Sequence, residues 1–416
     1  MNPSCEVVIT GLGVVSPIGI GHSQFWESLK QGACGVAVRE RFAETDLPFR
    51  IASNIKDFDA KKFIKPRKAL KIMCDPIQFG CAAAAMAVEH AGLEKGAVSP
   101  DRIGTVFGTE TFFADPNEVA DVFRRCTVDQ DYQHDRWGEF AMREIQPLWM
   151  LKYLPNMVAS HISIANDARG PSNSICQGEA SGLLALIEAA DLIQRGSADV
   201  IVAGGTGSQM ALSAMLYRGT SMLSKRIHEP DKAVRPFDID RDGMVAGEGA
   251  GALVVESAEH AAARGATVLA RLGGWSRSYQ NRTSDLFTLG VQQNYEAALE
   301  HSGVSASDVG LVNAHAAGSI DGDLVEARAI RHVFGDTPVV AHKSNFGNLG
   351  PGTSIVELIA SVLAVQEEIV PATINCDSVD PQCDVNVVTS EMPLDSKCII
   401  KSSFSPTGQI ASIVLA

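Results

Sequence analysis

Short β-branched runs alternate with Ala-rich stretches along almost the whole chain, and this alternation restricts the fold more than any other feature. Strands alternating with helices are typical of layered α/β proteins, in which helices cover the faces of a sheet. Two sets of such segments follow one another along the chain. The expected strands are 7–10, 199–205, 251–257, 309–315, 337–342 and 398–404, and the expected helices are 82–91, 182–195 and 354–366.

The composition is that of a folded chain with a hydrophobic core. Of the 416 residues, 45% are hydrophobic and 20% are charged, which excludes wholesale disorder. Lys and Arg number 35 against 49 Asp and Glu, so the net charge is −14 and nucleic acid is not an expected partner. No apolar run approaches the roughly 18 residues of a membrane span, so no membrane association is expected.

The nine cysteines are scattered and form no CxxC pairs. Reduced thiols in a cytoplasmic protein explain this pattern better than a disulfide framework or a zinc site. The first residues lack a basic segment followed by an apolar one, so no signal peptide is expected. The Gly-rich stretches at 11–13 and 246–251 lack the rest of a dinucleotide fingerprint. We therefore expect neither a metal nor a cofactor.

The strands and helices divide the chain into two similar sets. Each set has a strand, a polar or Gly-rich turn and a long apolar helix, which predicts two related halves, 1–256 and 257–416. Residues 115–150 stand apart because they are rich in charge and poor in buried runs. They are expected to form an excursion on the surface or at a subunit interface, with ordinary helix–loop packing as the alternative.

The most informative segment is GPSNSICQGEASGLLALIEAADLI at 170–193. A short strand leads through a small, flexible turn into a helix that is apolar almost all round, which predicts a buried helix. Many α/β enzymes place a nucleophile at such a turn, where the helix dipole favours negative charge. The residue at this turn is Glu179.

Motifs along nearly the whole chain resemble those of the β-ketoacyl-acyl-carrier-protein synthases, the elongating ketosynthases of fatty acid and polyketide synthesis. The resemblance implies a thiolase-like α/β fold of two related halves and five layers, α/β/α/β/α. It implies acyl carrier protein and acyl or malonyl thioesters as partners, and a dimer with itself or with a Cys-containing ketosynthase. The matching segments are 7–19, 154–163, 170–175, 198–205, 235–256, 312–327 and 343–357.

The catalytic positions depart from the family pattern. The resemblance places a nucleophilic Cys nine residues after Gly170, and this chain has Glu179 there. The first catalytic His is retained as His315, whereas the second falls on Asn348. The Cys-His-His set therefore reads Glu179-His315-Asn348. The resemblance also assigns supporting positions, which this chain keeps as Lys343, Glu357, Asp323 and Glu326.

Three nearby features bear on whether the site still works. Cys176 is a weak alternative nucleophile, because it precedes the turn and is expected to be a buried structural residue. The resemblance places Phe112 and Phe113 near the acyl tunnel, where they either block it or simply pack in the core. Phe404 matches a gating Phe, but Pro406 replaces a flexible glycine of that loop and should make opening harder.

Autonomous condensation is not expected, because a carboxylate is a weak nucleophile toward a thioester. The leading hypothesis is a non-condensing, chain-length-factor-like partner of an active ketosynthase. A decarboxylase of malonyl thioesters remains open, as does an altered acyltransferase or hydrolase with Glu179 as general base and His315 as acid. A non-catalytic module that binds acyl groups or carrier proteins is the fourth possibility.

Overall fold

The protein's structure, a computed structural model, describes residues 5–40, 50–112, 114–211, 213–215, 219–281 and 284–416. Among these residues, eleven strands form one mixed sheet. They are β1 (Val7–Ser16), β2 (Gly19–Ile20), β5 (Ile103–Gly108), β8 (Ser172–Ile175), β9 (Val200–Ser208), β10 (Glu248–Ser257), β11 (Ala270–Tyr279), β12 (Leu311–Asn313), β13 (Val339–Val340), β16 (Ile399–Phe404) and β17 (Gln409–Leu415).

Three short pairs of strands lie outside this sheet. They are β3 (Val36–Val38) with β4 (Ile51–Ser53), β6 (Thr127–Val128) with β7 (Asp131–Tyr132), and β14 (Ile369–Val370) with β15 (Met392–Pro393). The described α-helices are α1 (His22–Lys30), α2 (Asp75–His90), α3 (Ala120–Cys126), α4 (Trp137–Glu144), α5 (Met157–Asn166), α6 (Ser181–Gln194), α8 (Ala258–Ala263), α9 (Ser284–Ser302), α10 (Ile320–Phe334), α11 (Lys343–Phe346) and α12 (Thr353–Glu367).

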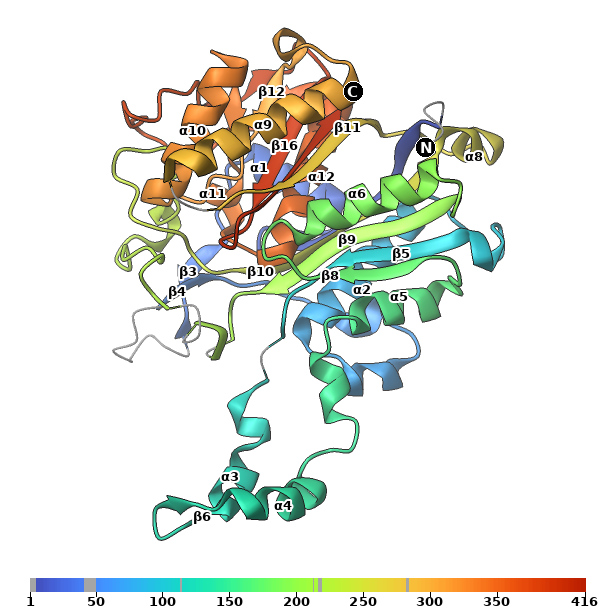
Figure 1. The fold of residues 1–416 in the computed structure, drawn as a ribbon, viewed down its shortest axis with the longest axis vertical. Helices are drawn as coiled ribbons and strands as arrows, with labels where there is room; N and C mark the ends of the chain where they lie inside the picture. Colours follow the sequence, from blue (N-terminus) through green and yellow to red (C-terminus); the bar gives the residue numbers. More distant parts are fainter. Residues whose placement is uncertain (1–4, 41–49, 113, 212, 216–218, 282–283) are drawn as a thin grey trace.

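The sheet is ordered β13-β12-β16-β17-β11-β1-β10-β9-β5-β8, and it folds over two buried helices. Helix α6 contacts β5 and β9 on one side and β11 and β17 on the other, and α12 likewise contacts both β10 and β16. Helices α2 and α5 cover the outer face of the first half of the sheet, and α9 covers that of the second half with α10 against it (Figure 1). These five layers confirm the predicted thiolase-like α/β fold.

The two halves of the sheet join through β1. This strand pairs along most of its length with β10, and its first three residues also pair with Ala270–Leu272 of β11. The chain thus crosses from one half of the sheet to the other between β10 and β11. The boundary at residue 256 and the common origin of the two halves remain predictions.

Glycines allow the start of α6 to approach its neighbours closely. A Cβ added to Gly182 would lie 2.7 Å from the carbonyl oxygen of Pro351, and one added to Gly205 of β9 would lie 2.2 Å from the same oxygen. Any side chain at either position would separate these elements. The first turn of α6, strand β9 and the segment before α12 therefore meet at one place.

Residues 115–150 project from the body as an arm that carries α3, β6, β7 and α4 (Figure 1). Large hydrophobic side chains on the arm are exposed, most of all Met142 at 89% and Met150 at 58%. Among the described residues, no helix is both long and apolar enough to span a bilayer.

Candidate active site at the start of helix α6

Glu179 lies in the turn between β8 and α6. Gly178 adopts a φ of +60°, and the Ser181 hydroxyl accepts a hydrogen bond from Gln177 N and donates one to Gly178 O. This turn directs Glu179 inward, where the residue is only 8% exposed. The pocket around it has a volume of about 40 Å³ and is lined by Glu179, Met222, Met244, His315, Ala317, Ser319, Gly322, Asp323, Asn348, Phe404 and Pro406.

Asn348 faces Glu179 with its amide nitrogen. Its Nδ2 donates to Glu179 Oε1 at 3.3 Å, while its Oδ1 accepts from Gly350 N at 2.9 Å and from Thr353 Oγ1 at 3.3 Å. Because these two donors occupy Oδ1, the NH₂ group is the end that points into the pocket. The site therefore presents a fixed amide donor at the position where the family resemblance expects an imidazole.

His315 enters the pocket from the loop that follows β12. Its ring lies against Phe404 with a centroid distance of 4.1 Å, and Nδ1 lies 3.4 Å from Ser403 Oγ. That hydroxyl donates its hydrogen to Glu179 O at 3.0 Å, so it accepts from Nδ1–H. Ser403 thus bridges the imidazole and the backbone of the residue at the turn.

Two buried carboxyl groups hold the backbone N–H groups of the His315 loop. Glu326 accepts from His315 N at 2.7 Å and from Ala316 N at 2.8 Å, and Asp323 accepts from the three N–H groups of 317–319. Burial raises the pKa of Asp323 to about 6, against the effect of these hydrogen bonds. These two carboxyl groups therefore fix the backbone N–H groups of the loop.

Two buried ammonium groups hold the carbonyl side of the same loop. Lys343 Nζ donates to His315 O and to Glu357 Oε1, the latter at 2.9 Å. Lys401 Nζ donates to Ala314 O at 3.0 Å and lies 2.7 Å from Glu357 Oε2. Burial, reinforced by Lys343, lowers the pKa of Lys401 to about 8 although Glu357 opposes the shift. Peptide groups on both sides of His315 are therefore held by charged side chains.

Neither Lys401 nor Ser403 was predicted as a site residue from the sequence. A lysine in the middle of the apolar run 398–404 was a signal, since a charge inside a buried strand requires a buried partner. Its partner Glu357 lies on α12, and no local pattern connects the two residues.

The structure brings five of the predicted site residues to one pocket: Glu179, His315, Asn348, Asp323 and Phe404. Lys343 and Glu357 lie behind the His315 loop rather than in the pocket. Phe112 lines a different cavity and packs in a hydrophobic cluster with α2 and α5, whereas Phe113 lies outside the described residues. These positions carry no test of the residues' roles, which remain predictions.

The prediction that Cys176 is a buried structural residue is wrong. The side chain is exposed and its sulfur lies 3.2 Å from Thr109 Oγ1. The physical reason is that β8 is the terminal strand of the main sheet, so residues at its end have no neighbouring strand to cover them.

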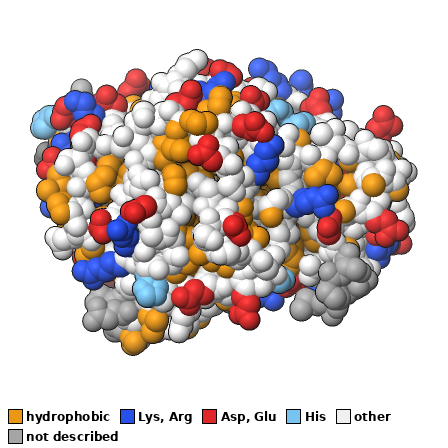
Figure 2. All heavy atoms as spheres, turned by 90° about the horizontal axis from the view of Figure 1, so that it is seen from above, with side chains coloured by type: hydrophobic (Ala, Val, Ile, Leu, Met, Phe, Trp, Pro, Cys, Tyr) orange, Lys and Arg blue, Asp and Glu red, His pale blue; other side chains and the backbone are white. Residues whose placement is uncertain are grey.

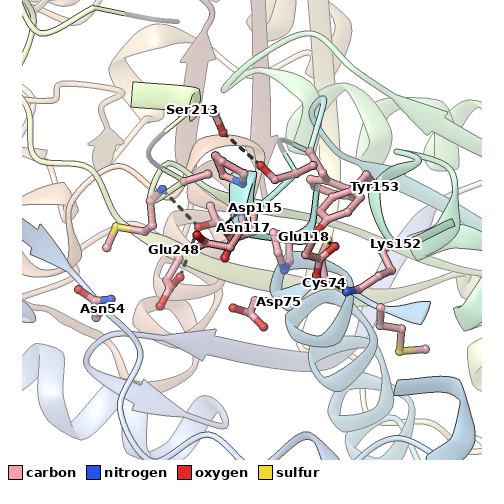
Figure 3. A pocket seen from close by; sticks show the side chains of 18 of the residues that line it. Asn54, Cys74, Asp75, Asp115, Asn117, Glu118, Lys152, Tyr153, Ser213 and Glu248 are labelled. Atoms are coloured by element: carbon pink, nitrogen blue, oxygen red, sulfur yellow. Dashed lines mark hydrogen bonds and ion pairs between the residues drawn. The ribbon is translucent and has the colours of Figure 1, made fainter. Parts of the chain in front are cut away.

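A larger cavity of about 540 Å³ lies at the base of the arm (Figure 3). Asp75 at the start of α2 and Glu248 at the start of β10 point into it, and Glu118, Lys152 and Tyr153 form its arm side. Burial raises the pKa of Glu248 to about 7. This cavity contains neither Glu179 nor His315, so we assign the candidate active site by the convergence of side chains and not by volume.

Comparison with protein families matches the chain to two models in series. Residues 4–261 match the β-ketoacyl synthase N-terminal domain and residues 274–377 match the C-terminal domain. Similar proteins include two named 3-oxoacyl-acyl-carrier-protein synthase 2. The one from Vibrio harveyi is 32% identical over 98% of both chains, and the one from Coxiella burnetii is 33% identical over 99% of this chain and 98% of that protein.

Solved structures show the same likeness. A β-ketoacyl synthase from Burkholderia phymatum superposes with a TM-score of 0.89 over 99% of both chains at 24% identity. The ishigamide ketosynthase/chain length factor superposes with a TM-score of 0.85 over 99% of both chains at 26% identity. A ketosynthase structure that includes a type II polyketide acyl-carrier protein and a hexaketide gives 0.85 over 99% of this chain and 98% of that chain, also at 26%. On the family models and these relatives together, the chain belongs to the β-ketoacyl synthase family.

Proposed function

We propose that this chain is a non-condensing ketosynthase homologue that acts as the chain-length-factor-like partner of an active ketosynthase. The observation that carries the proposal is the carboxyl group of Glu179, which occupies the pocket at the start of α6 and is hydrogen-bonded to Asn348. The volume of about 40 Å³ corresponds to about three water molecules at roughly 10–15 Å³ each. This volume leaves no room for an acyl chain attached at residue 179.

The chemistry supports the same conclusion. Condensation in this family begins with transfer of an acyl group to a thiolate, and a carboxylate at 179 attacks a thioester poorly. The mixed anhydride that would form is itself easily hydrolysed. Asn348 can still donate a hydrogen bond, but unlike an imidazole it cannot exchange a proton near neutral pH.

The proposed partner is a second ketosynthase-type chain, and carrier protein and its thioesters are the proposed ligands of the complex. Support comes from the arm, where exposed hydrophobic side chains such as Phe123, Tyr132 and Met142 lack a covering surface within the described chain. Phe123 and Tyr132 lie together with ring centroids 5.7 Å apart, and exposed apolar side chains that gather on a projecting arm favour an interaction surface. The solved ketosynthase/chain length factor and the carrier-protein complex are the relatives that motivate this assignment.

The charge distribution also bears on carrier-protein docking. On the face shown in Figure 2, the described Lys and Arg side chains are interspersed with Asp and Glu. An acidic carrier protein is attracted most strongly by a surface on which basic side chains predominate. We therefore assign the main carrier-protein contact to the complex with the partner and not to this face alone.

One observation favours a second candidate function. The loop of His315 is held on both sides by buried charged groups, as a catalytic imidazole would require. Such a site could bind the carbonyl of a malonyl thioester and stabilise the enolate after loss of CO₂. A malonyl-thioester decarboxylase is the alternative. Two further alternatives are hydrolysis with Glu179 as general base and carrier-protein binding without catalysis.

Intact-protein mass spectrometry after incubation with an acyl-carrier thioester tests the proposal. The natural chain should show no acyl adduct, whereas Glu179→Cys should acquire one because it restores a thiol at the helix start. Glu179→Gln is the matched control, since it keeps the size and the acceptor oxygen without adding a nucleophile. An adduct on residue 179 of the natural chain would overturn the proposal.

The partner assignment has its own experiment. Native mass spectrometry of this chain mixed with a Cys-containing ketosynthase from the same organism should show a heterodimer. Homodimer alone would contradict the partner role. If the isolated chain releases CO₂ from a malonyl thioester and His315→Ala abolishes this release, the decarboxylase becomes the better supported function.

A further inference from the structure

A cavity of about 90 Å³ lies on the outer face of the first half of the sheet, between helices α2 and α5 and the segment 63–69. The two helices lie side by side there (Figure 1). The cavity shares no lining residue with the pocket of Glu179. It is therefore a separate site from the candidate active site.

The wall of this cavity is mostly apolar. Met73, Ala84 and Ile162 are buried there, at 4%, 1% and 2% exposure. Burial raises the pKa of the Cys81 thiol to about 12, so this side chain stays uncharged and contributes to the apolar wall. At roughly 10–15 Å³ for each water-sized position, the volume offers about six to nine positions, which suits one six-membered ring with a substituent.

One polar atom in the wall is left without a partner. His161 Nε2 is buried and makes no hydrogen bond within the described chain. Burial lowers the pKa of His161 below its ordinary value, so the imidazole is neutral near neutral pH. A buried polar atom without a hydrogen bond is costly, and a ligand that supplies the bond removes that cost.

A water molecule alone does not complete this site. Buried waters make about three hydrogen bonds each, and few partners are present here. The remaining nitrogen-bearing side chains of the wall are Asn166, whose amide already donates to Ile162 O at 2.9 Å, and Lys65, which is exposed. A phenol is better matched, because its ring contacts the apolar wall and its hydroxyl can donate to Nε2 in one tautomer or accept from it in the other.

The segment that forms one side of this cavity is strongly basic. Residues 61–71 contain six cationic side chains and no acidic one, although the whole chain has a net charge of −14. Because Lys65 lines the cavity, a negative group on the ligand is attracted to this side while the ring lies inside. All six cationic side chains are exposed and none forms an ion pair with a described residue; they are Lys61, Lys62, Lys65, Arg67, Lys68 and Lys71.

We propose that this cavity binds a phenolic carboxylate, with its ring between α2 and α5, its hydroxyl on His161 Nε2 and its carboxylate beside Lys65. Each part of the ligand matches one observed feature: the apolar wall, the buried nitrogen without a partner and the cluster of cations. The site does not depend on the proposed function, because none of these residues lines the pocket of Glu179.

Isothermal titration calorimetry with para-hydroxyphenylacetate tests the site on the full chain. A ligand of this size is expected to bind with a Kd of about 0.1–1 mM. Phenylacetate, which lacks the hydroxyl, should bind about tenfold more weakly to the natural chain. His161→Phe, which keeps a ring but has no nitrogen in it, should bring the two ligands to the same affinity.

Two pairs of variants locate the ligand. Ala85→Leu fills the cavity and should abolish saturable binding, whereas Ala114→Leu, the same substitution in the cavity at the base of the arm, should leave it unchanged. Lys65→Gln should weaken binding of para-hydroxyphenylacetate about threefold at low salt and less at high salt, because exposed charges are screened. Lys397→Gln, on the surface outside this segment, is its control and should have no effect.

Absence of saturable binding to the natural chain at about 10 mM ligand would overturn the site. Equal affinities of the two ligands for the natural chain, or unchanged binding in Ala85→Leu, would overturn it as well. If His161→Phe fails to fold, His161→Leu replaces it with the same expectation. None of these outcomes bears on acylation at residue 179, so this proposal and the proposed function fail independently.

Discussion

The two segments that face each other across the small pocket are held in place by different means. The loop of His315 has its N–H groups on Asp323 and Glu326 and its carbonyls on Lys343 and Lys401, all of them buried. The turn of Glu179 is held by serine hydroxyls, and its carboxyl group accepts from the Asn348 amide. One side of the site is thus an ionic framework, and the other is a short turn with neutral contacts.

This difference explains how one side of the site can change while the other persists. Removing one member of a buried charged network leaves its partners unpaired in the interior, which destabilises the whole fold. Replacing the residue at the turn changes a side chain that faces a cavity, and the strand and helix around it still form. Reaction chemistry at 179 is therefore separable from folding, whereas the framework of His315 is not.

Glu357→Ala should disrupt the ionic framework behind His315 and have the largest effect on stability. It leaves the ammonium groups of Lys343 and Lys401 without their shared carboxylate at 0% exposure, so we expect a loss of about 3–5 kcal/mol in the free energy of unfolding. Urea unfolding measures it. Glu367→Ala, an exposed position near the end of the same helix, is the control and should cost less than about 0.5 kcal/mol. Similar values for both variants would contradict an ionic framework.

Lys401→Met should change how the stability of the ionic framework depends on pH. The pKa of Lys401 is about 8 in the fold, below the roughly 10.4 of an unfolded lysine. Between these values an unfolded lysine binds more protons than the folded Lys401, so the contribution of Lys401 to stability should rise as pH increases from about 8 to about 10. The difference from Lys401→Met should slope by about 1.4 kcal/mol per pH unit in that range.

Lys397→Met is the control for this measurement, because Lys397 pairs with Glu368 on the surface at 59% exposure. Its stability curve should run parallel to that of the natural chain. Parallel curves for Lys401→Met as well would show that the buried ammonium group does not titrate in this interval.

Glu179→Gln should have the smallest effect. The amide keeps the oxygen that accepts from Asn348, so we expect a change of less than about 1 kcal/mol in the free energy of unfolding. Thermal unfolding followed by circular dichroism provides the measurement. A loss above about 2 kcal/mol would mean that the charge at 179 belongs to the framework, and the contrast between the two sides would disappear.

Most of the fold was predictable because its signals are local. The apolar run at 182–195 predicted a buried helix and that at 354–366 a long apolar helix, and the structure shows them as α6 and α12. Cys176 was mispredicted because burial at the end of an edge strand depends on the order of strands, which local pattern does not contain. Ser403 was missed for a similar reason, since its contacts with His315 and Glu179 form only when the chain folds.

The sequence by itself determined that a carboxylate stands at the start of the central helix, because the spacing from Gly170 through the turn to the apolar helix is local and leaves no other register. The tertiary structure decided which charged groups surround His315. Its reason is physical: a buried charge is stable only beside a partner, and here the partners come from α10, α12 and β16, which become neighbours only when the sheet folds around its two central helices.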